Sequence, residues 1–517
     1  MPARRSVTGR AAQGTRTRKP GMNGHGESDG RIVPVKPANK VTPVAAERVE
    51  GRQPAKGNAD SATRPGRRTG LGGKAGLDRV REVARRDKDA RFTSLLHHVD
   101  VDRLREAYEA ISPKASPGVD GVTWGAYGVQ LEDNLRDLHD RVHSGGYRAK
   151  PSRRAYIPKA DGRKRPLGIA SLEDKVVQRA LVEVLNAVYE EDFAGFSYGF
   201  RPGRSQHDAL DALAVGIEQK KVNWVLDADV SSFFSTLDRA WLGKFLEHRI
   251  ADTRVLRLVQ KWMNAGVIED GEWSEELEGS PQGASISPLL ANVYLHYVFD
   301  RWAKQWKKRQ ARGDVIIVRF ADDFIVGFQH LGDAKQFLRD LRERFAKFNL
   351  GLHPTKTRLI EFGRFAAENR KKRGLGKPET FDFLGFKHVC AKDRKGRFAL
   401  RRFTVAKRLR AKLHDVKDKL KRVMHRPVPE QGRWLGSVVR GHMAYYGVPG
   451  NSKALRAFRV QATRHWCKAL RRRSQRHRLS WERMGRLADR WLPPVRIVHP
   501  WPSVRFAANT RGRSPLR

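Results

Sequence analysis

The chain has 517 residues, enough for two or three domains with sizeable cores, and it is 39% hydrophobic and 31% charged. Its formal net charge is +47, and Lys and Arg recur from end to end, which favours a polyanionic partner over a basic tail on an ordinary enzyme. Nucleic acid is the usual polyanion that balances such an excess. The two cysteines, Cys390 and Cys467, form no Cys-x-x-Cys pair, which excludes a disulfide framework and a four-cysteine zinc site.

The N-terminal segment, residues 1–75, is rich in Gly, Arg, Pro, Ser and Thr and has almost no aromatic residues. It cannot bury enough apolar surface to offset the entropy of ordering, so it is predicted to be a disordered basic extension. No apolar run follows Arg4 and Arg5 as in a secretory signal, and no stretch approaches the about 20 apolar residues of a membrane helix. We therefore expect a soluble, cytoplasmic protein with reduced cysteines and no membrane partner.

Regular structure is expected from about Leu77, where helical periodicity begins, and the segment 101–110 is amphipathic at helical spacing. Residues 116–121 have the composition of a turn. From Tyr156 to about Phe386, short β-rich runs alternate with helices, which predicts an α+β core with an antiparallel sheet. The clearest examples are strands at 224–226 and 315–320 and helices at 172–189 and 333–349. From about Thr404 onward the pattern is helical and strongly basic.

Two adjacent carboxylates, Asp322 and Asp323, lie within the segment Arg-Phe-Ala-Asp-Asp-Phe-Ile-Val-Gly at 319–327, which predicts strand, tight turn and strand. Two neighbouring carboxylates inside an apolar hairpin repel one another and lose hydration. A divalent cation is the usual partner that makes such a pair tolerable. The alternative is a solvated Asp-Asp turn, which is common for the dipeptide alone but less so between two hydrophobic strands.

An apolar strand from Trp224 delivers Asp227 and Asp229 near its end, on one face of the strand because they lie two residues apart. A single aspartate at a strand end is most often a helix cap or a turn residue. The Asp-Asp hairpin farther along favours a metal site instead. Phosphoryl transfer by two metal ions needs carboxylates that hold the ions about 3.5–4 Å apart, and these two segments could supply them together.

These motifs, with the stretch Gly-Ser-Pro-Gln-Gly-Ala-Ser-Ile-Ser-Pro-Leu-Leu-Ala-Asn-Val-Tyr-Leu at 279–295, resemble the bacterial group II intron reverse transcriptases of the maturase type. The Phe-Ala-Asp-Asp box is similar to that family's Tyr/Phe-Ala-Asp-Asp motif, and Asp229 matches the single aspartate of its preceding palm motif. The resemblance runs from about Ser116 to about Arg505. It implies a right-hand polymerase with fingers and palm at 76–400, a helical thumb/maturase domain at 401–455 and a basic DNA-binding region at 456–517.

The resemblance implies an RNA-directed DNA polymerase that binds its host intron RNA, promotes splicing and supports intron mobility at a target DNA by target-primed reverse transcription. Asp229, Asp322 and Asp323 would be the catalytic residues and would hold two Mg²⁺ ions, with deoxynucleoside triphosphates as substrates. Many relatives end in a zinc-supported His-Asn-His endonuclease with cysteine pairs, and this chain has neither feature. We therefore expect insertion to use another primer, such as a nascent strand at a replication fork.

The resemblance also assigns contacts to the incoming nucleotide. Lys159 and Arg165 flank the turn of a basic hairpin and would bind the triphosphate, the arginine through two hydrogen bonds. Gln282 would lie beside the nucleotide and template. Phe234 would exclude a ribose 2′-hydroxyl, with Phe233 as the alternative. A solvated basic loop and an ordinary Pro/Gly loop before a helix are the simpler interpretations of the first two motifs.

Contacts to RNA and DNA are expected along the rest of the chain. Arg201 and Arg204 would contact template phosphates or order the fingers, Lys356 would lie near the active site, and a Leu-Gly-Phe turn at 384–386 would position the primer end. Arginines interleaved with aromatics suit RNA, and the residues concerned are Arg433, Arg440, Tyr445 and Tyr446. An ordinary packed helix with both tyrosines in its core is the alternative. The predicted DNA contacts are Arg464, Lys468, Arg471, Arg472 and Arg473.

Three other functions stay open. An RNA-binding splicing factor with a decayed polymerase would have lost one or more of the aspartates, and all three are present. An RNA-dependent RNA polymerase would usually carry a smaller residue or Asp in place of Phe234. The polymerase motifs do not distinguish a retroelement relative recruited to defence. The oligomeric state and the identities of the intron and the DNA target do not follow from the sequence.

Overall fold

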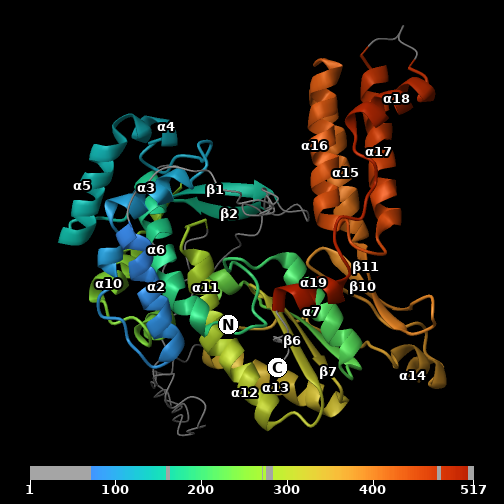
Figure 1. Ribbon diagram of the computed structural model, residues 1–517, viewed down its shortest axis with the longest axis horizontal. Helices are drawn as coiled ribbons and strands as arrows, with labels where there is room; N and C mark the ends of the chain where they lie inside the picture. The colour runs from blue at the N-terminus through green and yellow to red at the C-terminus, as the bar shows by residue number, and fades with distance from the viewer. Residues whose placement is uncertain (1–70, 159–163, 270–271, 275–282, 474–478, 511–517) are drawn as a thin grey trace, which may run out of the picture.

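The computed structural model describes residues 71–158, 164–269, 272–274, 283–473 and 479–510. They form the α+β fold that the sequence predicted, with an N-terminal unit and a C-terminal helical bundle on opposite sides of a central unit (Figure 1). The predicted disorder of the first 75 residues lies outside the described part, except that helix α2 begins at Leu71, before the predicted boundary.

The N-terminal unit is built around a long buried helix, α6 (Leu172–Asp192), which α2 and α3 cover. The Ser171 side chain caps α6 by accepting a hydrogen bond from the backbone N–H of Asp174. Strands β1 and β2 pair antiparallel, as the predicted hairpin requires, and the sheet order is β2-β1-β4-β5. The other elements are α2 (Leu71–Arg86), η1 (Leu96–His98), α3 (Val101–Glu109), α4 (Trp124–Tyr127), η2 (Gly128–Gln130), α5 (Leu131–Ser144), β1 (Ser152–Pro158), β2 (Lys164–Ile169), β4 (Val267–Glu269) and β5 (Glu272–Ser274).

The central unit is a four-stranded antiparallel sheet covered on both faces. Its order is β6-β7-β3-β8, made of β6 (Val315–Phe320), β7 (Asp323–Phe328), β3 (Trp224–Asp229) and β8 (Arg358–Glu361). Alternate residues enter different cores, because successive side chains of a strand point to opposite faces. Leu226 and Val326 pack on the face covered by α13 (Leu331–Lys347), whereas Val225 and Ile325 pack on the face covered by α7 (Gln206–Gln219). The strands predicted at 224–226 and 315–320 and the helices predicted at 172–189 and 333–349 are all present.

The remaining elements of the central unit surround this sheet and lead into a second sheet of order β11-β10-β9. Their bounds are α8 (Phe233–Thr236), α9 (Arg239–Glu247), α10 (Thr253–Asn264), α11 (Ser287–Leu295), the π-helical segment η3 (His296–Asp300), α12 (Arg301–Arg309), α14 (Ala366–Lys372), β9 (Phe381–Phe383), β10 (Phe386–Lys392) and β11 (Phe398–Thr404).

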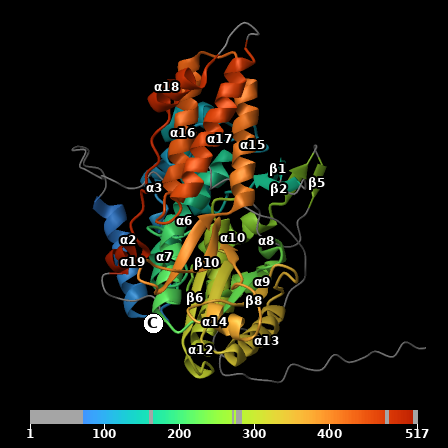
Figure 2. The same cartoon turned by 90° about the vertical axis from the view of Figure 1, so that its right-hand side faces the viewer.

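The C-terminal bundle consists of α15 (Ala406–Arg422), α16 (Val428–Tyr446), α17 (Ser452–Arg471) and α18 (Trp481–Trp491) and stands over the central sheet (Figure 2). One hydrophobic core, from Val416 to Leu492, joins all four helices. The predicted domain boundary between 455 and 456 falls within α17, and this core continues across it. After α18 the chain returns to the central unit, where α19 (Pro502–Thr510) packs on α7.

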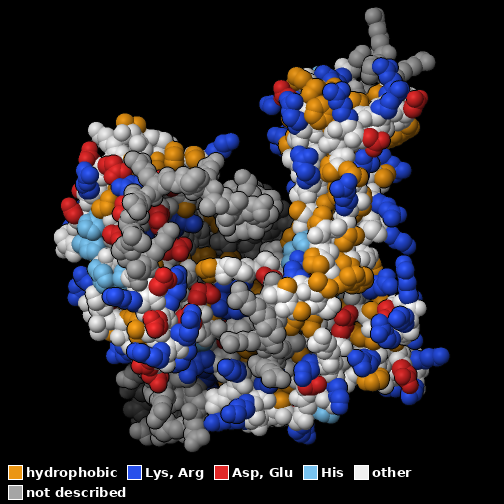
Figure 3. Space-filling view, viewed as in Figure 1, with side chains coloured by type: hydrophobic (Ala, Val, Ile, Leu, Met, Phe, Trp, Pro, Cys, Tyr) orange, Lys and Arg blue, Asp and Glu red, His pale blue; other side chains and the backbone are white. Residues whose placement is uncertain are grey.

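The surface is hollowed between the N-terminal unit and the bundle, above the central unit (Figure 3). Lys and Arg side chains are spread over the visible face of the bundle and much of the rest of the surface. None of the helices in the described ranges is both long and apolar enough to span a membrane.

Candidate active site

The antiparallel sheet brings the two predicted carboxylate segments together. Asp229, the last residue of β3, is the register partner of Asp323, the first residue of β7. Such partners have Cα atoms about 4.5–5.5 Å apart. Asp322 is the second residue of the two-residue turn that joins β6 to β7, and it directly precedes Asp323. Three aspartates from two distant parts of the chain thus lie at one end of one sheet.

The hairpin turn has a strained backbone. Ala321 has a φ of +56°, in the left-handed region that a tight two-residue turn between twisted strands requires. The segment that contains Gly199 lies so close to the turn that a Cβ atom on Gly199 would be 2.3 Å from the backbone nitrogen of Ala321. Position 199 therefore admits only glycine, and the turn is held against the segment before α7.

Cations stand beside both aspartates of β3. The Lys356 ammonium forms an ion pair with Asp229, and the Arg358 guanidinium binds Asp227 at 3.0 Å. Burial raises the pKa of Asp227, while Arg358 acts in the opposite direction. The loop that carries Lys356 is fixed to the strand end because the His353 N–H donates to the Asp229 carbonyl at 2.8 Å. Lys356 thus lies next to the aspartates, where the sequence analysis placed it, whereas the contact between Arg358 and Asp227 was not foreseen.

The donor chemistry of this end of the sheet fits a divalent cation, because Mg²⁺ prefers carboxylate oxygens. In the described ranges, however, no group of three or more His, Cys, Asp or Glu side chains is arranged so that it could hold a metal ion. The Asp229 carboxylate is instead ion-paired with the Lys356 ammonium. A metal ion would have to exchange with this ammonium.

The two aromatic candidates follow β3 in helix α8. Phe233 is 2% exposed and Phe234 is 6% exposed, and their rings meet edge to face with centroids 5.3 Å apart. Phe233 also packs against Tyr294 of α11, so it is the more deeply integrated of the two in the core. The chain reaches α8 through Ser232, whose φ is +49°.

The predicted nucleotide contacts are only partly described. Lys159 and Gln282 lie outside the described residues, and Arg165 lies in β2, in register with Ile157 of β1. Gly283, next to Gln282, has a φ of +99°, and a Cβ atom there would lie 2.5 Å from the Gly168 carbonyl oxygen. The loop before α11 therefore approaches β2, the strand that carries Arg165.

The side chains of Arg201 and Arg204, which lie shortly before α7, point inward. The Arg201 side chain is 3% exposed and binds the Glu190 carboxylate at 2.9 Å, and it also donates to the carbonyls of Ala194 and Ser197. Arg204 donates to the Gly195 carbonyl at 2.8 Å, and burial lowers its pKa. The contacts of Arg201 fit the ordering role among the two that we expected, because contact with template phosphates would require these bonds to break.

The tyrosines of α16 take part in packing. Tyr445 donates a hydrogen bond to the Leu384 carbonyl at 2.7 Å and stacks on Phe386 with centroids 5.6 Å apart. The Tyr446 ring also contacts Phe386, with centroids 5.2 Å apart, and lies edge to face with Tyr445 at 4.8 Å. Both are half-buried, which is the packed arrangement given above as the alternative to RNA contact. They join the bundle to the Leu-Gly-Phe turn.

The predicted cationic contacts of the bundle differ in exposure. Arg473 is half-buried, and Arg471 donates to the Leu479 carbonyl at 2.6 Å, so both also serve the local fold. The exposed cations of this set are Arg433, Arg440, Arg464, Lys468, Arg471 and Arg472.

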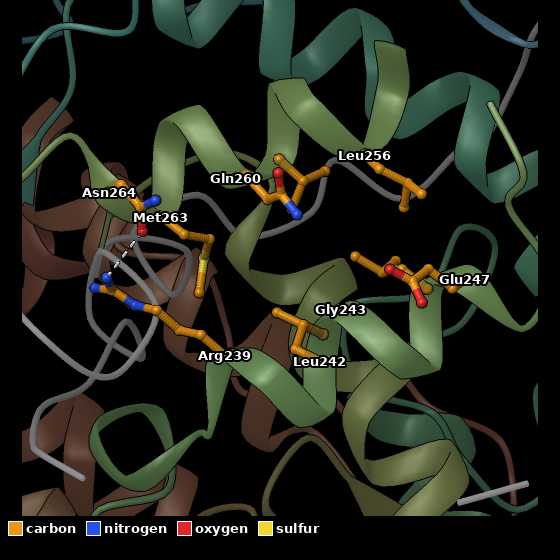
Figure 4. A pocket seen from close by; sticks show the side chains of 10 residues that line it. Arg239, Leu242, Gly243, Glu247, Leu256, Gln260, Met263 and Asn264 are labelled. Atoms are coloured by element: carbon orange, nitrogen blue, oxygen red, sulfur yellow. Dashed lines mark hydrogen bonds between the residues drawn. The ribbon is translucent and has the colours of Figure 1, made fainter. Parts of the chain in front are cut away.

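A pocket lies between α9 and α10 and is lined by none of the predicted site residues (Figure 4). Leu242, Leu256 and Met263 line it, and Arg239 donates to Asn264 at its edge at 3.3 Å. Its volume of about 70 Å³ is far below the about 300 Å³ or more of a typical ligand site. It is too small for a nucleotide.

Comparison with known proteins places this geometry in a family. Residues 157–388 match the family described as reverse transcriptase (RNA-dependent DNA polymerase). The chain is 37% identical over 241 residues to Protein YkfC of Escherichia coli (strain K12), covering 41% of this chain and 63% of that protein. It is 31% identical over 235 residues to Group II intron-encoded protein LtrA of Lactococcus lactis subsp. cremoris, covering 45% of this chain and 39% of that protein.

A longer alignment joins the chain to the Putative COX1/OXI3 intron 1 protein of Saccharomyces cerevisiae, at 25% identity over 425 residues, covering 69% of this chain and 50% of that protein. The chain thus spans less than two thirds of each of these relatives. Reverse transcriptases generally use divalent metal ions, in agreement with the carboxylates at the end of the sheet. Residues 157–388 thus match a reverse transcriptase domain, and the chain is similar to group II intron-encoded proteins.

Proposed function

We propose that the chain is an RNA-directed DNA polymerase that binds its host group II intron RNA, promotes splicing and supports intron mobility at a DNA target by target-primed reverse transcription. The observation that carries the proposal is the register pairing of Asp229 with Asp323, with Asp322 beside them, inside the matched domain. The net charge of +47 supports nucleic acid as the partner.

In this proposal Asp229, Asp322 and Asp323 are the catalytic carboxylates and the ligands of two Mg²⁺ ions. The ions, when bound, would activate the primer 3′-hydroxyl and stabilise the leaving pyrophosphate. Asp229 gives up its ion pair with Lys356 as it becomes a ligand. Lys356 then remains as a cation beside the reacting phosphates, where a charge-assisted hydrogen bond to an oxygen is favourable.

Nucleotide selection is assigned to four residues. Lys159 and Arg165 bind the triphosphate, and Gln282 lies beside the nucleotide and template. Phe234 acts as the barrier to a ribose 2′-hydroxyl, which is supported by its position in α8, directly after β3, and by a ring that is nearly buried but not fully so. A fixed ring of this kind selects deoxynucleotides by steric exclusion.

The exposed cations of the bundle are the proposed contacts to RNA and DNA. Arg433 and Arg440 on α16 face intron RNA, with Arg464, Lys468 and Arg472 on or after α17 assigned to DNA. Because each phosphate contact releases counterions, binding should weaken steeply as salt is raised. Tyr445 and Tyr446 act through packing against the Leu-Gly-Phe turn rather than by stacking on bases.

Primer extension on poly(rA)/oligo(dT) with Mg²⁺ tests the proposal. Asp322→Ala should abolish synthesis and leave RNA affinity within about tenfold, since one carboxylate is a small part of the protein's electrostatic field. The control is Asp314→Ala, which removes an aspartate just before β6, at the opposite end of the hairpin, where it pairs with Lys220. Extension by the Asp322→Ala protein at the parent rate would refute the metal assignment.

A further inference from the structure

A buried arginine lies directly beneath the Asp-Asp turn. Arg319 of β6 and its partner Asp300 are both 0% exposed. Nε and Nη2 of Arg319 donate to the two Asp300 oxygens at 2.7 and 2.6 Å. Nη1 donates to Asn292 Oδ1 at 3.0 Å and to the Ala321 carbonyl at 2.9 Å. One planar guanidinium thus joins α11, the π-helical segment η3 and the hairpin turn.

This arrangement is not explained by stability. Replacing a buried ion pair with apolar residues of similar size is often neutral or stabilising, because desolvation of the two charges offsets their attraction. The other residues of β6 are Val, Ile and Phe, so an apolar residue at 319 would continue the strand pattern. What Arg319 provides is a directed hydrogen bond to the carbonyl of Ala321, the residue that holds the left-handed backbone angle.

The hydrogen bonds around Arg319 also extend to the segment 198–199, which packs against the turn. Asn292, which accepts from Arg319, donates through Nδ2 to the Gly199 carbonyl at 2.7 Å. The backbone N–H of Tyr198 donates to the Arg319 carbonyl at 2.9 Å. Since Gly199 is packed on the Ala321 nitrogen, the turn is fixed from both sides by one hydrogen-bonded network.

Asp300 comes from an unusual helical element. It is the last residue of η3, a π-helical segment between α11 and α12. Single π turns inside a helix are rare and occur frequently at functional sites, because the extra residue changes which side chains share a face. Here the segment delivers a carboxylate to a fully buried position beneath the hairpin.

We propose that Arg319, held by Asp300 and Asn292, is a positioning residue that fixes the left-handed turn at Ala321 and thereby sets the positions of Asp322 and Asp323, the proposed metal ligands. This inference rests on the proposed function, because it assigns the network a role only if the two aspartates bind metal. Groups that orient metal ligands typically change metal affinity or activity by about 10- to 100-fold when they are altered.

The test uses Arg319→Lys in the full chain, which keeps the positive charge but loses the planar fork that binds Asp300, Asn292 and Ala321 together. Mn²⁺ affinity is measured by electron paramagnetic resonance of the free ion, in the presence of template and primer. The Mg²⁺ concentration for half-maximal primer extension is measured in parallel. We expect the Mn²⁺ dissociation constant and the Mg²⁺ concentration for half-maximal extension both to rise by about 10- to 100-fold. The extension rate should fall less at saturating metal than at low metal.

The matched control is Arg249→Lys. Arg249 is 1% exposed and pairs with Asp192 at 2.9 Å, but its other hydrogen bonds go to carbonyls of the 84–90 segment in the N-terminal unit. The Arg249→Lys protein should lose thermal stability as the Arg319→Lys protein does, but its Mn²⁺ affinity should be unchanged. A folded Arg319→Lys protein with the parent's Mn²⁺ affinity would overturn the inference.

Asn292→Ala provides a second variant if Arg319→Lys does not fold, because it leaves the Arg319–Asp300 pair in place. Weakened Mn²⁺ binding by this variant supports the inference, and parental binding overturns it. Failure of the proposed function looks different. The parent would then neither extend a primer nor bind Mn²⁺ in a way that Asp322→Ala abolishes, whatever the state of Arg319.

Discussion

The contact between α7 and the C-terminal segment depends on one buried carboxylate, and Asp211→Asn tests it. Asp211 is 0% exposed. Its Oδ1 accepts from Arg402 of β11 at 2.8 Å, and its Oδ2 accepts from Arg505 of α19 at 2.5 Å. The Arg402 side chain is 3% exposed, whereas that of Arg505 is 16% exposed. The substitution keeps the shape of the side chain but removes the counter-charge of both arginines.

The different burial of the two arginines determines how much unfolding free energy each variant is expected to lose. Without Asp211 the guanidinium of Arg402 remains buried and unpaired, and removing one partner of a buried ion pair typically costs about 3–5 kcal/mol of unfolding free energy. Arg505→Ala leaves the pair between Asp211 and Arg402 intact and removes a partly solvated donor. A hydrogen bond to a charged group contributes about 1.5–3 kcal/mol, so the smaller loss is expected there.

Urea denaturation of the full chain measures the loss of unfolding free energy in each variant. Hydrogen exchange of the amides in α7, β11 and α19 shows which of these elements lose protection. Both variants should release protection in α19, and only Asp211→Asn should also release β11. The reasoning is refuted if Asp211→Asn costs less than about 1 kcal/mol, or if Arg505→Ala is the more destabilising of the two.

Three further predictions concern the turn, the ring and a buried imidazole. Gly199→Ala places a Cβ 2.3 Å from the Ala321 nitrogen, so primer extension should fall by about 100-fold while RNA binding, measured by filter retention, is unchanged. Phe234→Ala should raise incorporation of ribonucleotides relative to deoxynucleotides in single-nucleotide extension, whereas Phe233→Ala should mainly lower thermal stability. Burial lowers the pKa of His388 to about 3, so below pH about 6.5 the unfolded chain takes up a proton that the folded chain excludes. His388 should therefore contribute a loss of stability that approaches about 1.4 kcal/mol per pH unit as pH falls below about 5.5, and His388→Phe should reduce the slope in urea titrations by that amount.

Sequence patterns predicted the elements of the central sheet because both faces are buried and each strand is short, apolar and bounded by turns. The hydrophobic run before Asp229 and the two runs around the Asp-Asp pair gave the strands directly. Which strands are neighbours depends on tertiary packing, so the register that pairs Asp229 with Asp323 came from the fold. The metal roles of these residues stay predictions.

Side-chain direction was harder to foresee from the sequence. An arginine in a basic chain suggests phosphate contact, but Arg201 turns inward because Glu190, on the preceding helix, is within reach. The boundary between 455 and 456 came from the family resemblance, and in the structure it lies inside α17. Arg319 did carry a usable signal, as a single charge in a run of Val, Ile and Phe, and a buried partner is the common reason for such a residue.

Local strain in this chain gathers around the end of the sheet that carries the aspartates. Within the described ranges, the non-glycine residues with positive φ are Phe200, Ser232, Ala321, Asn349 and Leu384. Phe200 follows the glycine packed on the turn, Ser232 follows β3, Ala321 is in the turn itself, and Leu384 accepts the hydrogen bond from Tyr445. Each such residue costs about 1–3 kcal/mol and persists only where its surroundings impose it. A sheet covered on both faces can sustain that cost in free energy. Strained residues that lie together at one end of the sheet, beside a buried Arg–Asp pair, are expected where geometry has been selected over stability.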